Sequence, residues 1–188
     1  MGTVVIVAGV NGAGKSTLLD SATTEAGLDE LASVLGLRRD ASPVRRIELR
    51  DLDRLRSFDG VILVEVSITR LFDSDMRCHL RRLEYLVARG DAVSCTLTIG
   101  RTDAVVRLVR RNSRMVLRLL RRTRYRRALS IVYRSVRAVV RYRDMVGLHG
   151  RWSTWCVDHA VREVVVSFEQ VTGASADSAN RGSRQVSQ

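Results

Sequence analysis

The chain has 188 residues, 45% of them hydrophobic, and a formal net charge of +12 at pH 7. This length supports one domain with a buried core. No apolar run reaches 18 residues, which argues against a membrane-spanning helix. Three widely spaced cysteines without a C-x-x-C pair, and a start that enters an apolar run directly, favour a cytoplasmic protein with reduced thiols over a secreted, disulfide-bonded one.

The positive charge is concentrated in one segment. Residues 101–143 contain 15 arginines and a single acid, Asp103, whereas the rest of the chain sums to −2. Thirty-one of the 32 basic residues are arginine, and the only lysine is Lys15. Both the basic segment and the single lysine therefore need an explanation.

The N-terminal stretch contains the most specific motif. The apolar run of residues 3–8 predicts a buried parallel strand, and apolar spacing predicts a helix over residues 16–35. Between them, GVNGAGKST satisfies G-x-x-x-x-G-K-[ST], the P-loop motif, in which backbone N–H groups and a helix N-terminus surround phosphate oxygens. The motif predicts that ATP binds to Gly9, Val10, Asn11, Gly12, Ala13, Gly14, Lys15, Ser16 and Thr17.

The lone lysine fits this interpretation. Lysine offers a compact ammonium on a flexible stem, whereas arginine carries a wide planar fork that a narrow loop would crowd. We therefore expect Lys15 to contact the β- and γ-phosphates as a catalytic residue.

The remaining chain alternates between predicted strands and helices. Further strands are expected at residues 45–49, 60–66, 92–99 and 152–157, and helices at 73–88, 101–146 and 160–171. The helical prediction for 101–146 follows from the lack of Gly and Pro. This alternation predicts a three-layer α/β fold, with about five parallel strands and helices on both faces, in a single domain over residues 1–172. Residues 173–188 are expected to be a disordered tail.

Ligands of such sheets bind at the carboxyl ends of the strands, where Glu65, Gly100, Arg101 and Asp158 are expected. Magnesium bound to a triphosphate uses the loop hydroxyl, here Ser16, and often an acid at a strand end. Glu65 closes the apolar run VILVE, so Ser16 and Glu65 are the predicted metal-binding pair, with Glu65 also a catalytic candidate. One of three further acids could act as a general base: Glu48, Asp51 or Asp53.

The order of these parts resembles the P-loop nucleoside and nucleotide kinases, most of all the thymidylate kinases. The similar segments are GVNGAGKSTLL, VILVEVSITR, VSCTLTIGRTDAVVRLVRRNSR, VYRSVRAVVRY and WSTWCVDHAVREVVVSFEQV. The resemblance implies a P-loop NTPase fold and ATP- and Mg²⁺-dependent phosphoryl transfer to a nucleoside monophosphate or similar small acceptor. Thymidylate kinases tend to have Asp-Arg-Tyr where this chain has Glu65–Val66–Ser67. The arginine is missing, and Arg70 is a substitute one helical turn later.

Three interpretations apply to the arginine-rich region 101–146. Its helices could simply carry a solvated arginine face. A few arginines could form a lid over the triphosphate that stabilises charge during transfer, the best candidates being Arg118, Arg121, Arg122 and Arg124. The region could also grip nucleic acid, with Tyr125, Tyr133 and Tyr142 available for stacking. The main alternative to a kinase is therefore a nucleotide-regulated NTPase that binds nucleic acid. A member that binds nucleotide and catalyses little is a third alternative.

Overall fold

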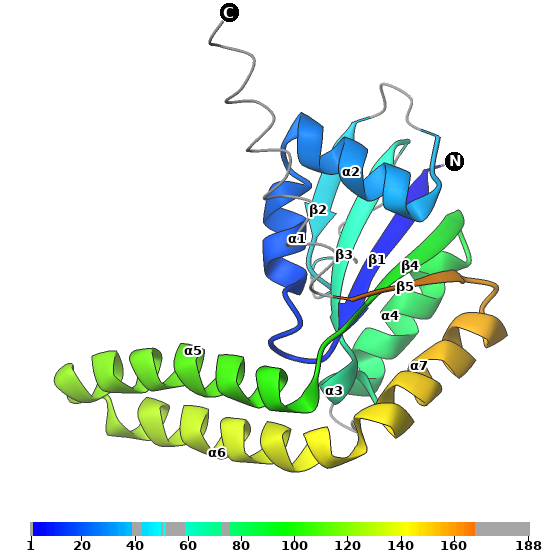
Figure 1. Ribbon diagram of the computed structural model, residues 1–188. Helices are drawn as coiled ribbons and strands as arrows, with labels where there is room; N and C mark the ends of the chain where they lie inside the picture. Colours follow the sequence, from blue (N-terminus) through cyan, green and yellow to red (C-terminus); the bar gives the residue numbers. More distant parts are fainter. Residues whose placement is uncertain (1, 39–42, 50, 52–58, 73–75, 168–188) are drawn as a thin grey trace, which may run out of the picture.

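The computed structural model describes residues 2–38, 43–49, 51, 59–72 and 76–167. Within these ranges five parallel strands form one sheet in the order β2-β3-β1-β4-β5 (Figure 1). The strands are β1 (Thr3–Gly9), β2 (Val44–Ile47), β3 (Val61–Ser67), β4 (Asp91–Thr98) and β5 (Arg162–Ser167). The predicted α/β class and parallel sheet are confirmed.

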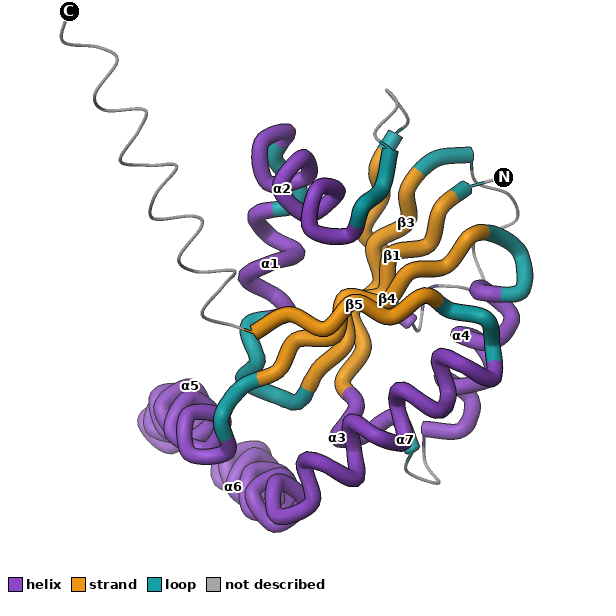
Figure 2. The backbone as a smooth tube through the Cα atoms, turned by 45° about the vertical axis from the view of Figure 1, so that its right-hand side comes forward, coloured by secondary structure: helices purple, strands orange, loops and turns teal. Residues whose placement is uncertain are grey.

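Helices cover both faces of the sheet. Helices α1 (Lys15–Ser21) and α2 (Glu25–Leu35) lie on one face, and α4 (Arg77–Val87) and α7 (Met145–Asp158) on the other (Figure 2). The short α3 (Ile68–Leu71) directly follows β3. The central strand β1 is buried from Val4 onwards because strands flank it on both sides and helices cover both faces.

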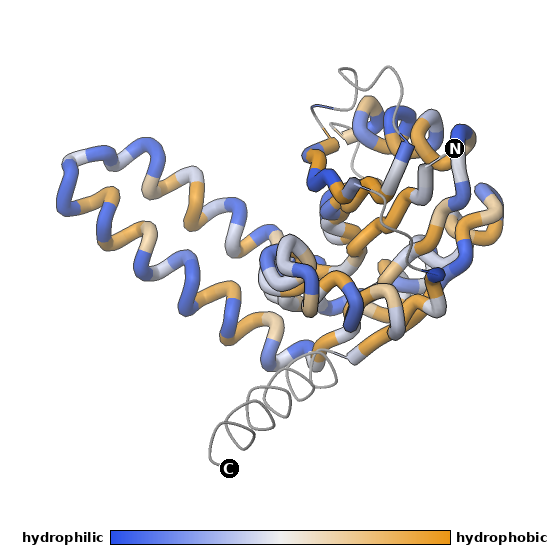
Figure 3. Tube along the Cα trace, turned by 90° about the horizontal axis from the view of Figure 1, so that it is seen from above, coloured by the Kyte–Doolittle hydropathy of each residue, from blue (hydrophilic) through white to orange (hydrophobic). Residues whose placement is uncertain are grey.

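Two long helices project from the carboxyl edge of the sheet as an antiparallel hairpin. They are α5 (Arg101–Arg121) and α6 (Tyr125–Arg141), followed by a 3-10 turn at Tyr142–Asp144 that leads into α7 (Figures 1 and 3). The predicted helical character of residues 101–146 is confirmed. Its break at 122–124 needs no Gly or Pro, because Thr123 adopts a left-handed conformation with φ 54°.

The predicted helix over residues 16–35 is two helices. Thr24 starts α2, because its hydroxyl accepts a hydrogen bond from the Gly27 N–H at 3.2 Å. A threonine side chain that caps a helix in this way competes with continuation of the preceding one.

Two of the later predictions were wrong. Residues 152–157, predicted as a strand, belong to α7, and residues 162–167, predicted as helix, form β5. Trp152, Trp155 and Cys156 are buried at helical spacing, and the run of three valines in β5 favours a strand. Residues 168–171 and the predicted tail, 173–188, lie outside the described part of the chain.

Because these two elements differ from the prediction, Asp158 lies elsewhere than expected. It ends α7 just before β5 begins, so it lies at the amino edge of the sheet and not at the carboxyl edge where we expected it. The other three residues do lie at the carboxyl edge. Glu65 is near the end of β3, and Gly100 and Arg101 follow the end of β4.

Candidate functional site

The glycine-rich loop, residues 9–17, connects the centre of the sheet to the N-terminus of α1. Gly12 and Gly14 have positive φ values of 90° and 87°, which favour glycine. At Gly9 (φ 154°) a Cβ atom would lie 2.8 Å from the Leu97 carbonyl oxygen on β4. The loop therefore follows a tight path against β4 that other residues at these positions would strain.

Lys15 lies beneath this loop. Its side chain is only 4% exposed, and Nζ donates a hydrogen bond to the Val10 carbonyl oxygen at 2.9 Å. Burial lowers the pKa of Lys15 to about 8; the Glu65 carboxylate partly opposes this shift, and the Arg111 guanidinium adds to it. The one lysine is thus a buried cation held next to a loop of backbone N–H groups.

This lowered pKa makes folding stability depend on pH. Between pH 8 and 10.5 the unfolded chain binds more protons at Lys15 than the folded chain, so the free energy of unfolding rises with pH in that window, by up to about 3 kcal/mol. Burial raises the pKa of Cys95, Cys156 and Tyr142 to about 11, 12 and 12. Above pH 9 these three groups therefore lower the free energy of unfolding as pH rises.

The comparison with Lys15→Met isolates the lysine, because the other three groups are common to both proteins. We expect urea unfolding to show the wild type gaining stability relative to Lys15→Met as pH rises from 8 to 10.5. A difference between the two proteins that does not change over this range would contradict the buried, shifted ammonium.

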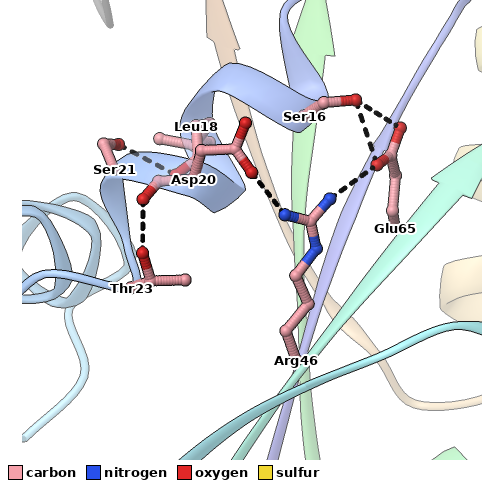
Figure 4. Close-up of polar contacts among 7 residues, drawn as sticks. All are labelled: Ser16, Leu18, Asp20, Ser21, Thr23, Arg46 and Glu65. Carbon is pink, nitrogen blue, oxygen red and sulfur yellow. Dashed lines mark hydrogen bonds and ion pairs between the residues drawn. The ribbon is translucent and has the colours of Figure 1, made fainter.

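Ser16 and Glu65, the predicted metal-binding pair, lie next to each other at the start of α1 and near the end of β3. The Ser16 hydroxyl lies 3.2 Å from both carboxylate oxygens of Glu65 (Figure 4). Arg46 from β2 bridges Glu65 Oε2, at 3.4 Å, and Asp20 on α1. The carboxylate is therefore oriented by a hydroxyl and a guanidinium at the mouth of the loop.

The base of the hairpin also touches the loop. The buried Tyr142 hydroxyl donates to the Asn11 carbonyl oxygen at 2.6 Å, and Ser67 donates to Asn11 Oδ1 at 2.8 Å. Arg141 donates to the Thr69 carbonyl oxygen at 2.6 Å. The sequence offers Tyr142 as a stacking residue, but its ring is fully buried, and its hydroxyl supports the loop instead, a role that the local pattern does not indicate.

The predicted lid arginines are not brought to the loop. Arg118 lies about 25 Å along α5 from Arg101, at a rise of about 1.5 Å per residue, and Arg121 and Arg122 lie still farther out, exposed at the hairpin tip. The α5 residues beside the loop are those of the first turns: a Cβ atom at Gly12 would lie 3.3 Å from the Ala104 carbonyl oxygen and 3.5 Å from Arg107 Cβ.

A pocket of about 290 Å³ opens beside Glu65 at the carboxyl ends of β2 and β3. It combines cationic, acidic and apolar side chains, and its lining residues are Arg46, Ile47, Glu48, Leu49, Glu65, Ser67, Arg70, Leu71, Met76 and His79. The buried Nδ1 of His79 has no hydrogen-bond partner among the described residues. Of the three candidate bases, Glu48 lines this pocket, whereas Asp53 lies outside the described residues.

In the described ranges no group of three or more His, Cys, Asp or Glu side chains is arranged to hold a metal ion. None of the described helices combines the length and apolarity that a membrane crossing requires. Comparison with known proteins found no matching family model, no similar curated protein and no similar solved structure.

Proposed function

We propose that the protein is a P-loop phosphotransferase that transfers a phosphoryl group from ATP to a small anionic acceptor resembling a nucleoside monophosphate. One observation carries the proposal: the loop with Lys15 and Ser16 and the pocket with Arg46 and Arg70 share the side chain of Glu65. A donor on the loop and an acceptor in the pocket would therefore meet at this carboxylate.

The loop residues suit the donor. Backbone N–H groups of residues 9–17 and the N-terminus of α1 would hold the phosphates, and the Lys15 ammonium would neutralise the β- and γ-oxygens. Ser16 and Glu65 would hold Mg²⁺ together with phosphate oxygens and water, and the ion would supply charge neutralisation at the γ-phosphate. Arg107 and Arg111, from the first turns of α5, replace the distal arginines as candidate stabilisers of the transferring group.

The pocket residues suit an acceptor with one charged and one apolar end. Arg46 and Arg70 would bind a phosphate or carboxylate, the His79 Nδ1 would gain a hydrogen-bond partner, and Leu49 and Leu71 would contact the apolar part. In the reaction an acceptor oxygen attacks the γ-phosphorus, the bond to the β–γ bridging oxygen breaks, and ADP leaves.

An acceptor screen tests this proposal. Purified protein, ATP and Mg²⁺ are incubated with nucleoside monophosphates, nucleosides and other hydroxyl or carboxylate acceptors while ADP formation is followed. At least one anionic acceptor should raise turnover about tenfold or more over the acceptor-free rate, and Arg70→Gln should raise its KM without changing the Kd for ATP. ATP binding without stimulation by any acceptor would contradict the kinase and support a nucleotide-binding protein with little catalysis.

Glu65→Gln keeps the shape of the side chain and removes its charge. We expect the Mg²⁺ concentration for half-maximal turnover to rise at least about tenfold, because one carboxylate ligand would be lost. The measurement is a Mg²⁺ titration of the acceptor-dependent rate. Glu163→Gln is the matched control, since Glu163 lies on β5 and accepts from Thr96, away from the loop. Equal Mg²⁺ dependence in the two variants would remove Glu65 from the metal site.

The distribution of arginines supports a second candidate, nucleic-acid binding. On one side of the hairpin, Arg107, Arg111, Arg114 and Arg118 follow at intervals of three or four residues, as do Arg134, Arg137 and Arg141 on α6. Such a stripe would follow a phosphate backbone. Titration of DNA and RNA at two salt concentrations tests it: affinity should fall steeply with salt, and no binding at low salt would reject it.

A further inference from the structure

The two helices of the hairpin pack through a seam of small and apolar residues. On α6 and the 3-10 turn that follows it, positions 128, 131, 135, 138 and 142 recur at alternating intervals of three and four residues, as in a coiled coil. On α5, positions 105, 108, 112, 116 and 119 do nearly the same. Asn112 donates to the Ser135 hydroxyl at 2.8 Å inside this seam. The seam residues are buried or half-buried, so these two stripes are already covered by the contact between α5 and α6.

Each helix carries a second apolar stripe that nothing in the described chain covers. It is displaced from the seam stripe by one residue on both helices, and by two residues at Tyr133 and Val140, and its side chains are 40–68% exposed. We call this surface the outer apolar face; it comprises Val106, Val109, Leu117, Leu120, Tyr125, Leu129, Val132, Tyr133, Val136 and Val140.

The two outer stripes face the same side of the hairpin. One residue corresponds to a rotation of about 100° around a helix. Seen from one end of the hairpin, a step forward in the sequence turns clockwise on one helix and anticlockwise on its antiparallel partner. Equal displacements from a shared seam therefore turn both stripes to the same side (Figure 3 shows apolar residues recurring along both helices). The arginine stripes at 107–118 and 134–141 lie on the other side, and the arginines nearest the outer apolar face, Arg110 and Arg126, lie at its edges.

The size of this face matches a protein interface. Ten side chains at these exposures amount to on the order of 1,000 Å² of apolar surface, whereas a stable interface buries about 800 Å² per partner. Most monomers expose no contiguous apolar patch larger than about 300–600 Å². Residues 168–188, which lie outside the described part of the chain, contain three large apolar side chains, Phe168, Val171 and Val186, and so have too little apolar surface to cover a face of ten.

We propose that two copies of this chain pair through their outer apolar faces, so that two hairpins form an antiparallel four-helix bundle. The spacing favours helices as the occupant, because Tyr125, Leu129, Val132 and Val136 recur at intervals of four, three and four residues. A two-fold axis makes the same face serve both copies. The main arginine stripes point out of the bundle, separated by roughly two helix diameters, or about 20 Å, which exceeds the screening length of about 8 Å at physiological salt.

A lipid surface fits less well. Amphipathic helices that bind anionic membranes combine an apolar face with cations that reach the lipid headgroups. Here the seven arginines of the stripes Arg107–Arg118 and Arg134–Arg141 are turned away from the outer apolar face, so they would not reach the headgroups.

Sedimentation velocity of the nuclease-treated full chain tests the dimer. Between 1 and 100 µM we expect a dimer at 0.15 M NaCl that persists at 1 M NaCl, because apolar burial is not weakened by salt. The double substitution Leu129→Glu and Val136→Glu should weaken dimerisation at least 100-fold and yield monomer. Arg127→Glu with Arg134→Glu is the matched control, which introduces two glutamates at the same seven-residue spacing on the opposite side of α6 and should leave the dimer intact.

Circular dichroism and melting temperature establish that each variant folds, and Val109→Glu with Leu117→Glu repeats the test from α5 if the first pair does not. A monomeric wild type at 100 µM would overturn the proposal, as would a dimer that both apolar-face variants retain. Cosedimentation with vesicles of phosphatidylcholine and phosphatidylserine covers the lipid alternative. Vesicle binding by a monomeric wild type that Leu129→Glu with Val136→Glu abolishes would assign the face to a membrane instead.

Discussion

Lys15→Ala should weaken ATP binding at least 100-fold, or by about 2.7 kcal/mol. Lys15 is 4% exposed and its ammonium is directed at the backbone of the glycine-rich loop, so no solvent ion or neighbouring side chain can replace it when the side chain is truncated. Titration of a fluorescent ATP analogue measures the effect. Because nucleotide binding is the common step of every activity considered for this site, this substitution tests more of the proposal than any other.

Two further variants define what Lys15 contributes. Lys15→Arg keeps the charge but brings a planar guanidinium into a space closed by the Val10 carbonyl oxygen, and we expect it to lose most of the affinity as well. Arg89→Ala removes an equal charge from an exposed position between α4 and β4, at the opposite edge of the sheet, and should change the Kd for ATP by less than about threefold. An unchanged Kd in Lys15→Ala would refute the assignment of the loop as a triphosphate site.

Trp152→Ala should lower the free energy of unfolding by about 3–5 kcal/mol. The indole is fully buried between α7 and the sheet and stacks on Trp155 with ring centroids 4.9 Å apart. Its N–H donates to the hydroxyls of Ser94 and Thr96 on β4, at 3.2 and 3.0 Å. The substitution would leave a cavity and also remove the donor shared by these two buried hydroxyls.

Urea unfolding followed by circular dichroism measures this loss. Val157→Ala is the matched control, because Val157 lies on the same helix with 78% exposure and its truncation should cost less than about 0.5 kcal/mol. Similar losses for the two variants would contradict the packing of α7 against β4.

The glycine-rich loop and its neighbours were predictable because each element there has only one reasonable interpretation. The run before Gly9 is continuously apolar, and the motif that follows specifies a strand, a turn and a helix in that order. Ser16 and Glu65 are 49 residues apart, yet their meeting followed from the rule that parallel strands end at one edge of the sheet.

The C-terminal elements were not predictable from local pattern alone. Aromatic residues such as Trp152 favour strands by composition, but Trp152, Trp155 and Cys156 also suit a helix, and only packing against β4 decides between them. The prediction that Arg118, Arg121 and Arg122 cover the loop failed for a different reason. Periodicity indicates which residues share a helix face, but not whether that helix runs across the loop or away from it.

Among the described residues, the hairpin joins the main core at its base, through Ala104, Leu108, Ala138 and Tyr142. Its length is therefore independent of the sheet. A seven-residue unit can be added to or removed from α5 together with its partner unit on α6 while the seam, the outer apolar face and the arginine stripes all keep their orientation. The reach of this arm can thus vary in steps of about 10 Å while the glycine-rich loop and its tyrosine support stay in place.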